Sequence, residues 1–147
     1  GVTESGSGQR LRHTWAGTNP AYKTVTGYPY AFENAIAGKT GTTQNNSDGW
    51  FIGMVPNLIS GAWVGGEDRQ IRFARTKYGQ GASMALPIWG LFMKKCYADK
   101  SLSVSDGKFE KPEGEMTINI DCSKATSTTD ENNGKDSDDD KLEGIDF

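Results

Sequence analysis

The sequence predicts an α+β fold in which an antiparallel three-stranded meander is packed by a C-terminal helix. Three strand-like runs follow one another closely, at residues 36–42, 49–55 and 58–64, and a helical pattern covers residues 83–97. Because the links between the three runs are short and polar, each strand should pair with the next one along the chain. The 147 residues suffice for one modest domain.

Turn residues delimit the three runs. The dipeptide Pro56-Asn57 is short enough for a tight hairpin between the second and third strands. The polar residues 44–48 also suit a hairpin, and we expect Asp48 to cap that turn rather than to act as a base. Three aromatic residues of the strands are expected to pack the sheet: Trp50, Phe51 and Trp63.

The helix is predicted to begin near Ser83, a residue typical of N-caps, and to end near Tyr97. Five residues recur at spacings of three and four and lie along one stripe: Met84, Ile88, Leu91, Phe92 and Cys96. Pro87 falls close to the first turn, where proline is tolerated. We expect the helix to cover one face of the sheet with this stripe.

The two ends of the chain carry weaker patterns. Glycines and prolines interrupt residues 1–35, so we expect loops with short extended pieces there. Residues 99–122 are predicted to be an extended polar segment. Residues 123–147 contain almost no apolar side chains and an acidic run, which predicts a disordered acidic tail.

Composition excludes several classes of function. The net charge of -3 gives no basic surface for nucleic acid, and no apolar run approaches the about 18 residues of a membrane helix. No His, Cys or acidic residues have the spacing of a metal site, so we expect neither a metal nor a cofactor. The two cysteines, Cys96 and Cys122, leave open both a disulfide and two free thiols.

The triplet Lys39-Thr40-Gly41 lies in the first predicted strand and is the main functional motif. If this strand lies at the edge of the sheet, its free backbone groups can pair with an extended peptide, and Gly41 lets that peptide approach closely. Thr40 and Thr42 lie on the same face, where both hydroxyls could hold one carboxylate, while Lys39 points to the other face.

The triplet also has other interpretations. A P-loop requires a glycine five residues before Gly38, and that position holds Glu33. A solvated surface hairpin has a similar composition. In acyl-transfer enzymes, Lys-Thr-Gly accompanies a Ser-x-x-Lys nucleophile motif. The one match in letters, Ser105 to Lys108, contains a glycine and falls in a predicted loop, so we expect this chain to lack the nucleophile.

A longer stretch extends the motif from Ala37 to Leu58 and continues in Gly61-Ala62-Trp63-Val64-Gly65. This stretch resembles the third motif and the following strands of class A, bifunctional penicillin-binding proteins. The segments 1–8 and 84–93 also resemble the family, so the resemblance covers about residues 1–98. The resemblance implies the C-terminal portion of a transpeptidase domain, with the fold of penicillin-binding proteins and serine β-lactamases.

The resemblance also implies roles for individual residues. Lys39 would be the third-motif lysine and the backbone N–H of Thr42 an oxyanion donor. Substrate would be bound by Thr40, Gly41, Thr42 and Thr43. The implied partners are a peptidoglycan stem peptide or a β-lactam, together with the remainder of the transpeptidase domain, at the extracytoplasmic (periplasmic) face of the cell membrane. An alternative is a stand-alone module that binds peptides or peptidoglycan non-covalently, or a purely structural module.

Overall fold

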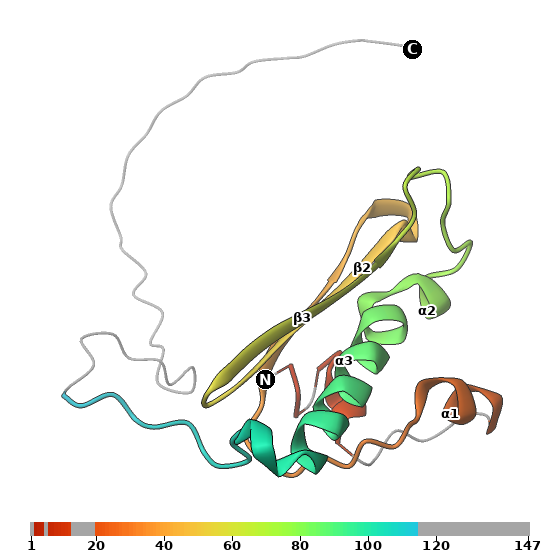
Figure 1. Cartoon of the computed structure of the whole chain (residues 1–147). Coiled ribbons are helices and arrows are strands. Elements are labelled where there is room, and N and C mark those ends of the chain that lie inside the picture. The colour runs from red at the N-terminus through yellow and green to blue at the C-terminus, as the bar shows by residue number, and fades with distance from the viewer. Residues whose placement is uncertain (1, 5, 13–19, 115–147) are drawn as a thin grey trace, which may run out of the picture. The chain divides into compact units, whose positions relative to one another are not determined.

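The computed structural model describes residues 2–4, 6–12 and 20–114. The chain divides into two compact units, Gly1–Lys111 and Pro112–Phe147, and the elements below belong to the first. The strands β1 (Ala37–Thr42), β2 (Asp48–Val55) and β3 (Leu58–Gly65) form an antiparallel sheet in the order β1-β2-β3. The long helix α3 (Gly81–Ala98) lies along one face of this sheet (Figure 1). The predicted meander and C-terminal helix are therefore confirmed.

The remaining elements are short. They are the 3-10 helices η1 (Gln9–Leu11), η2 (Gln44–Asn46) and η3 (Lys100–Leu102) and the α-helices α1 (Pro20–Thr26) and α2 (Thr76–Gly79). The prediction of loops and short extended pieces for residues 1–35 was wrong at α1. Pro20 occupies the first helical position, where its fixed φ and its missing N–H favour a helix start. The predicted tail, residues 123–147, and Cys122 lie outside the described residues.

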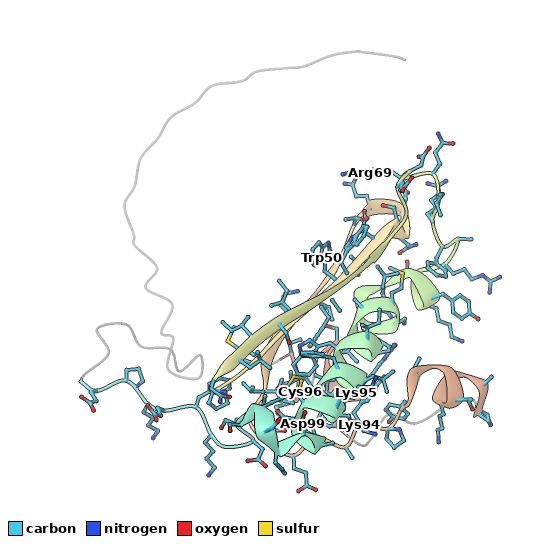
Figure 2. The ribbon with its side chains drawn as sticks, in the orientation of Figure 1. Trp50, Arg69, Lys94, Lys95, Cys96 and Asp99 are labelled. Carbon is cyan, nitrogen blue, oxygen red and sulfur yellow. The ribbon has the colours of Figure 1, made fainter. Side chains whose placement is uncertain are left out.

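The sheet has two faces of different character. Along β2, buried and exposed residues alternate, and Phe51 and Val55 point toward α3. Trp50 and Trp63 are directly opposed across β2 and β3, and they remain 45% and 48% exposed. Figure 2 shows Trp50 on the side of the sheet away from α3. As expected, all three strand aromatics pack on the sheet: Phe51 lies in the core, and Trp50 and Trp63 contact each other on the outer face, with ring centroids 6.2 Å apart.

The helix α3 is rotated relative to the prediction. Its buried residues include Ala85, Leu86, Trp89, Met93 and Cys96. Of the predicted stripe, Cys96 is buried and Met84 half-buried, whereas Ile88, Leu91 and Phe92 are exposed. The helix also begins at Gly81, two residues before the predicted Ser83. Two apolar stripes share the same helical period, so spacing alone could not decide which one faces the sheet.

Trp89 lies at the centre of the core. Its ring centroid is 5.2 Å from that of Phe51 and 6.4 Å from that of Phe32, and its Nε1 donates a hydrogen bond to Ser60 Oγ at 2.8 Å. A Cβ atom on Gly53 would stand only 2.4 Å from Trp89 Cζ2. The glycine therefore makes the room into which the indole packs, and this contact fixes the rotation of α3.

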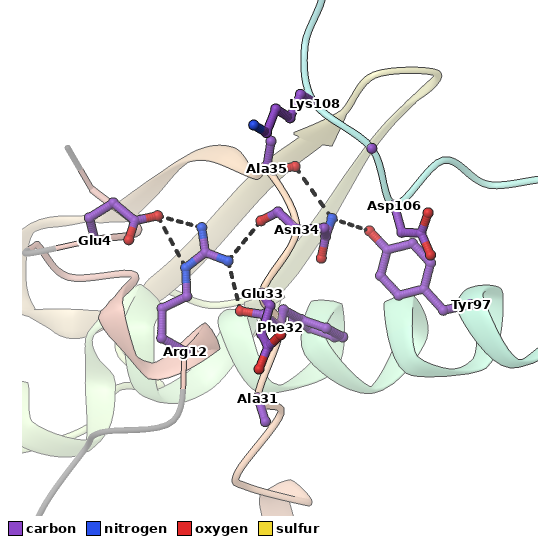
Figure 3. A pocket seen from close by; sticks show the side chains of 11 residues that line it. Glu4, Arg12, Ala31, Phe32, Glu33, Asn34, Ala35, Tyr97, Asp106 and Lys108 are labelled. Atoms are coloured by element: carbon purple, nitrogen blue, oxygen red, sulfur yellow. Dashed lines mark hydrogen bonds and ion pairs between the residues drawn. The ribbon is translucent and has the colours of Figure 1, made fainter.

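The N-terminal segment is tied to the core through two arginines. Arg12 pairs with Glu4, and its Nη1 donates to the carbonyl oxygens of Phe32 and Asn34 at 2.7 and 2.8 Å (Figure 3). Arg10 Nη1 donates to Ala82 O at 2.9 Å, at the start of α3. These bonds hold residues 2–4 and 6–12 against both the start of β1 and the helix α3.

Leu86→Ala should lower the free energy of unfolding by about 2–5 kcal/mol, because it empties a fully buried position of the core. Ile88→Ala, on the exposed side of the same helix, should change the free energy by less than about 0.5 kcal/mol. Urea unfolding of the 147-residue chain, followed by circular dichroism, measures both. A larger loss in Ile88→Ala than in Leu86→Ala would show that α3 is turned as its sequence pattern suggested.

Candidate functional site

The predicted motif lies on an edge strand. Within the described part of the chain, β1 pairs with β2 alone, so its second edge is open. The register places Lys39 opposite Ile52, Thr40 opposite Phe51 and Gly41 opposite Trp50. A strand edge of this kind can accept an extended peptide through backbone hydrogen bonds.

The direction of the backbone groups along β1 follows from one hydrogen bond. Thr43 N–H donates to Asp48 O at 3.0 Å, so the N–H of Thr43 points toward β2. Successive residues of an antiparallel strand alternate between the two edges. The N–H groups of Thr42 and Thr40 therefore point out of the open edge. The predicted oxyanion donor, Thr42 N–H, belongs to this outward set.

The side chains of the motif divide between the two faces of the sheet. Lys39 and Gly41 lie on the face of Trp50, and Thr40 and Thr42 lie on the face of α3, as strand alternation predicted. Lys39 Nζ nevertheless donates to Thr40 O at 2.9 Å, and that carbonyl points out of the open edge. The ammonium thus lies beside the edge that a peptide would occupy.

The two threonine hydroxyls have different partners. Thr40 Oγ1 lies 2.6 Å from Ser7 Oγ, and Thr42 Oγ1 accepts a hydrogen bond from Gly81 N–H at 3.0 Å. Because Thr42 uses only an acceptor position there, its own O–H proton stays available for a ligand. Ser7 and Gly81 were not identified from the sequence, where nothing connects them to residues more than thirty positions away.

The start of α3 rests directly on the motif strand. A Cβ atom on Gly81 would stand 2.3 Å from Gly41 O and 2.4 Å from Trp50 O. Real Cβ atoms do not approach backbone oxygens so closely, so only glycine fits here. The contact places the first N–H of the helix within reach of the Thr42 hydroxyl.

The turn after β1 is held by hydroxyl and carboxylate groups. Thr43 Oγ1 accepts from Asp48 N at 2.9 Å, and Ser47 Oγ donates to Asp48 Oδ2 at 3.0 Å. The bond from Ser47 lowers the pKa of the Asp48 carboxyl, Thr43 and the nearby Arg69 act in the same direction, and desolvation opposes them. Asp48 therefore serves the turn, as predicted, and so does the hydroxyl of Thr43, one of the predicted substrate-binding residues.

Two hollows are candidates for a binding site. One lies at the end of β1 and is lined by Thr42, Thr43, Gln44, Asn45, Ser47 and Arg69. The other surrounds Arg12, Asn34 and Tyr97 (Figure 3), and no residue of the motif lines it. Since the Arg12 guanidinium there is already bonded to Glu4 and two carbonyls, we assign the second hollow a structural role.

The remaining sequence candidates add no further site. Ser105 lies in a segment without helical structure, and its N–H donates to Asn57 Oδ1 at 2.8 Å, so it does not open a helix. Among the residues placed by the structure, no three His, Cys, Asp or Glu side chains are grouped to hold a metal. In the same residues, no helix combines the length and the apolar character needed to cross a membrane.

Comparison with profiles of known protein families finds no match for this chain. Individual curated proteins do match it. Penicillin-binding protein 1A of Aquifex aeolicus is 34% identical over 91 residues, which cover 60% of this chain and 11% of the relative. The protein of the same name from Escherichia coli is 32% identical over 99 residues, which cover 60% of this chain and 11% of the relative. The one from Neisseria flavescens is 39% identical over 82 residues, which cover 56% of this chain and 9% of the relative. The chain thus spans about a tenth of these relatives, and its resemblance to penicillin-binding proteins is confirmed.

Gly81→Ala should lower the free energy of unfolding by about 1–3 kcal/mol, because the added methyl group would collide with two backbone oxygens. Gly61→Ala is the matched control. Its Cβ would meet Ile52 Cγ1 at 3.5 Å, an ordinary contact, so the loss should stay below about 0.5 kcal/mol. Urea unfolding of both variants measures the difference, and a Gly81→Ala chain as stable as the wild type would contradict the close approach.

Ser47→Ala should raise the pKa of the Asp48 carboxyl toward the ordinary value of an aspartate, since it removes the main hydrogen bond to the charged form. A carboxyl group whose pKa is lower in the folded state than in the unfolded state stabilises the fold at pH values above its unfolded-state pKa. This stabilisation is lost as the pH falls through the folded-state pKa. The contribution of the Asp48 carboxyl group to the free energy of unfolding should therefore fall less on acidification in Ser47→Ala than in the wild type.

Carboxyl chemical shifts followed by NMR against pH measure this pKa directly. Asp99, whose pKa is lowered by Ser101, is the internal control and should not move in the Ser47→Ala chain. An Asp48 pKa that is the same in wild type and variant would show that Ser47 does not stabilise the carboxylate.

Proposed function

We propose that this chain, a relative of penicillin-binding protein 1A, supplies part of a D,D-transpeptidase domain that crosslinks peptidoglycan and binds penicillin. Residues 1–98 would be the C-terminal portion of that domain, followed by a polar segment (99–122) and an acidic tail (123–147). The observation that carries the proposal is the open edge of β1. It brings the Lys39 ammonium beside the outward N–H of Thr42, where a peptide strand can dock.

The proposed reaction is an acyl transfer at a D-Ala-D-Ala terminus. A serine supplied by the remainder of the domain attacks the carbonyl carbon of the penultimate D-Ala, and the terminal D-Ala leaves with the proton it needs. An amine of a second peptide strand then takes the acyl group and frees the serine. The carbonyl oxygen would carry negative charge in each transition state.

Three residues of β1 would act on this substrate. Thr42 N–H would be one of two oxyanion donors, and a donor of this kind contributes about 2.7–4 kcal/mol to transition-state stabilisation. The Thr42 and Thr40 hydroxyls would hold the terminal carboxylate, and Lys39 would provide positive charge beside the edge. Gly41 would allow the peptide backbone to approach. This reaction would take place at the extracytoplasmic, periplasmic face of the cell membrane.

Exposed apolar surfaces support a larger domain with the fold of penicillin-binding proteins and serine β-lactamases. The outer face of the sheet carries several large exposed side chains: Trp50, Ile52, Met54, Ile59 and Trp63. A contiguous apolar face of this kind marks an interface. The remainder of a transpeptidase domain would cover it.

The same features support a second candidate function. A stand-alone module could bind peptides or peptidoglycan non-covalently along the edge of β1, or complete the sheet of a partner protein through its outer face. The two candidates differ in one property. The first needs a serine from another part of the domain for any covalent reaction, and the second needs none.

A chimera tests the first candidate. In it, this chain replaces the region of the Escherichia coli relative with which it aligns over 99 residues, and the relative's own sequence supplies the rest. The chimera should be labelled covalently by a fluorescent penicillin, and the 147-residue chain alone should not. Lys39→Ala in the chimera should slow labelling by about tenfold or more, because it removes the positive charge beside the edge.

Lys95→Ala is the matched control, since Lys95 is an exposed lysine of α3 away from the edge of β1. Labelling is measured by in-gel fluorescence against time. A stable labelled band from the chain alone, or a folded chimera that takes no label, would refute the first candidate. Equilibrium binding of a D-Ala-D-Ala peptide to the chain alone, lost in Thr42→Val, would then favour the second.

A further inference from the structure

The hollow at the end of β1 contains a cation that the proposed reaction does not use. Arg69 lines it together with Thr42, Thr43 and Asn45. Figure 2 shows Arg69 at the end of the sheet where β1 turns into β2. Arg69 comes from the connection between β3 and α2, so a segment distant in sequence brings its charge to the motif strand.

The Arg69 guanidinium is not committed to an ion pair. Over residues 2–4, 6–12 and 20–114, the one ion pair within 4.0 Å joins Arg12 and Glu4. The neighbouring Asp68 carboxylate instead accepts a hydrogen bond from Gln70 N–H at 2.8 Å. Arg69 can therefore direct its donors to a ligand without breaking a contact to a carboxylate.

Asp48 is the acidic residue of the turn that borders the hollow, and its carboxylate is already hydrogen-bonded. Asp48 Oδ2 receives hydrogen bonds from Thr43 and Ser47 at 3.1 and 3.0 Å. Arg69 acts on this carboxylate only through space, and the effect lowers the pKa of Asp48. The positive field of the guanidinium thus reaches the turn that borders the hollow.

Thr42 belongs both to the open edge and to this hollow. A peptide paired along the edge of β1 would therefore bring its end beside Thr42 into the hollow. There an O–H group, a side-chain amide and a guanidinium would surround it. The planar fork of arginine matches a carboxylate through two parallel hydrogen bonds, which a lysine cannot reproduce.

We propose that Arg69 is a specificity-determining residue, whose guanidinium receives a carboxylate of the ligand that lies along the open edge of β1. This inference rests on the proposed function, because that function places a peptide with a free carboxylate at the edge. Lys39 does not line this hollow, and its ammonium donates to Thr40 O.

The test uses the full 147-residue chain and NMR detection of the Arg69 Nε–H and of the backbone amides of β1. Three probes are titrated: N-acetyl-D-Ala-D-Ala with a free carboxylate, the same peptide as its C-terminal amide, and acetate. The free acid should shift Arg69 and bind about tenfold more tightly than the amide. Arg69→Ala should remove most of that preference, the rest being supplied by the Thr40 and Thr42 hydroxyls, and Arg69→Lys should show an intermediate preference.

Arg75→Ala is the matched control, because it removes the same charge from the same connection outside the hollow. If the Arg69→Ala chain prefers the acid over the amide as strongly as the wild type does, the inference is overturned, while the proposed function, in which the Thr40 and Thr42 hydroxyls hold the carboxylate, stands. If acetate shifts Arg69 and neither peptide shifts β1, the carboxylate site is supported and the peptide-binding function fails. If no probe with a carboxylate shifts Arg69, the inference is overturned, whether or not the chimera is labelled by penicillin.

Discussion

The structure depends on the close approach of α3 to the sheet. Gly81 places the start of the helix on the carbonyl oxygens of Gly41 and Trp50, and Gly53 makes room for the Trp89 indole farther along. A side chain at either glycine would push the helix away from the strands. Because packing is dense at both contacts, the helix has one position along the sheet and one rotation.

This approach also determines how the motif strand presents its groups. With α3 on one face, Thr42 uses its hydroxyl oxygen to satisfy the Gly81 N–H, one of the unpaired donors at a helix start. The backbone N–H and C=O groups of β1 lie in the plane of the sheet, and those that point away from β2 stay at the open edge. The site is therefore an edge of backbone groups with Lys39 beside it and Arg69 at its end. A rigid helix contact thus supports an edge that is open for a partner strand.

Much of the strand architecture was predictable because it depends on local chemistry. Short polar turns and alternating side chains determine which residues pair and which face each occupies, and the motif residues Lys39, Thr40 and Thr42 are adjacent in sequence. Other parts depend on contacts between distant segments. Arg69 reaches the motif from a later connection, and Ser7 from an earlier one, so no local pattern could have identified them. The start of α1 was missed because Pro20 was taken as a breaker.

The rotation of α3 was the principal error, and it has a physical explanation. The stripe with the clearest spacing contains Ile88, Leu91 and Phe92, yet the stripe centred on Trp89 faces the sheet, where Gly53 leaves room for the indole ring. A helix that is apolar on two sides is typical of an element buried between two layers. Trp50 and its neighbours make the outer face of the sheet apolar as well. Both layers of this unit therefore carry apolar residues on their outer surfaces.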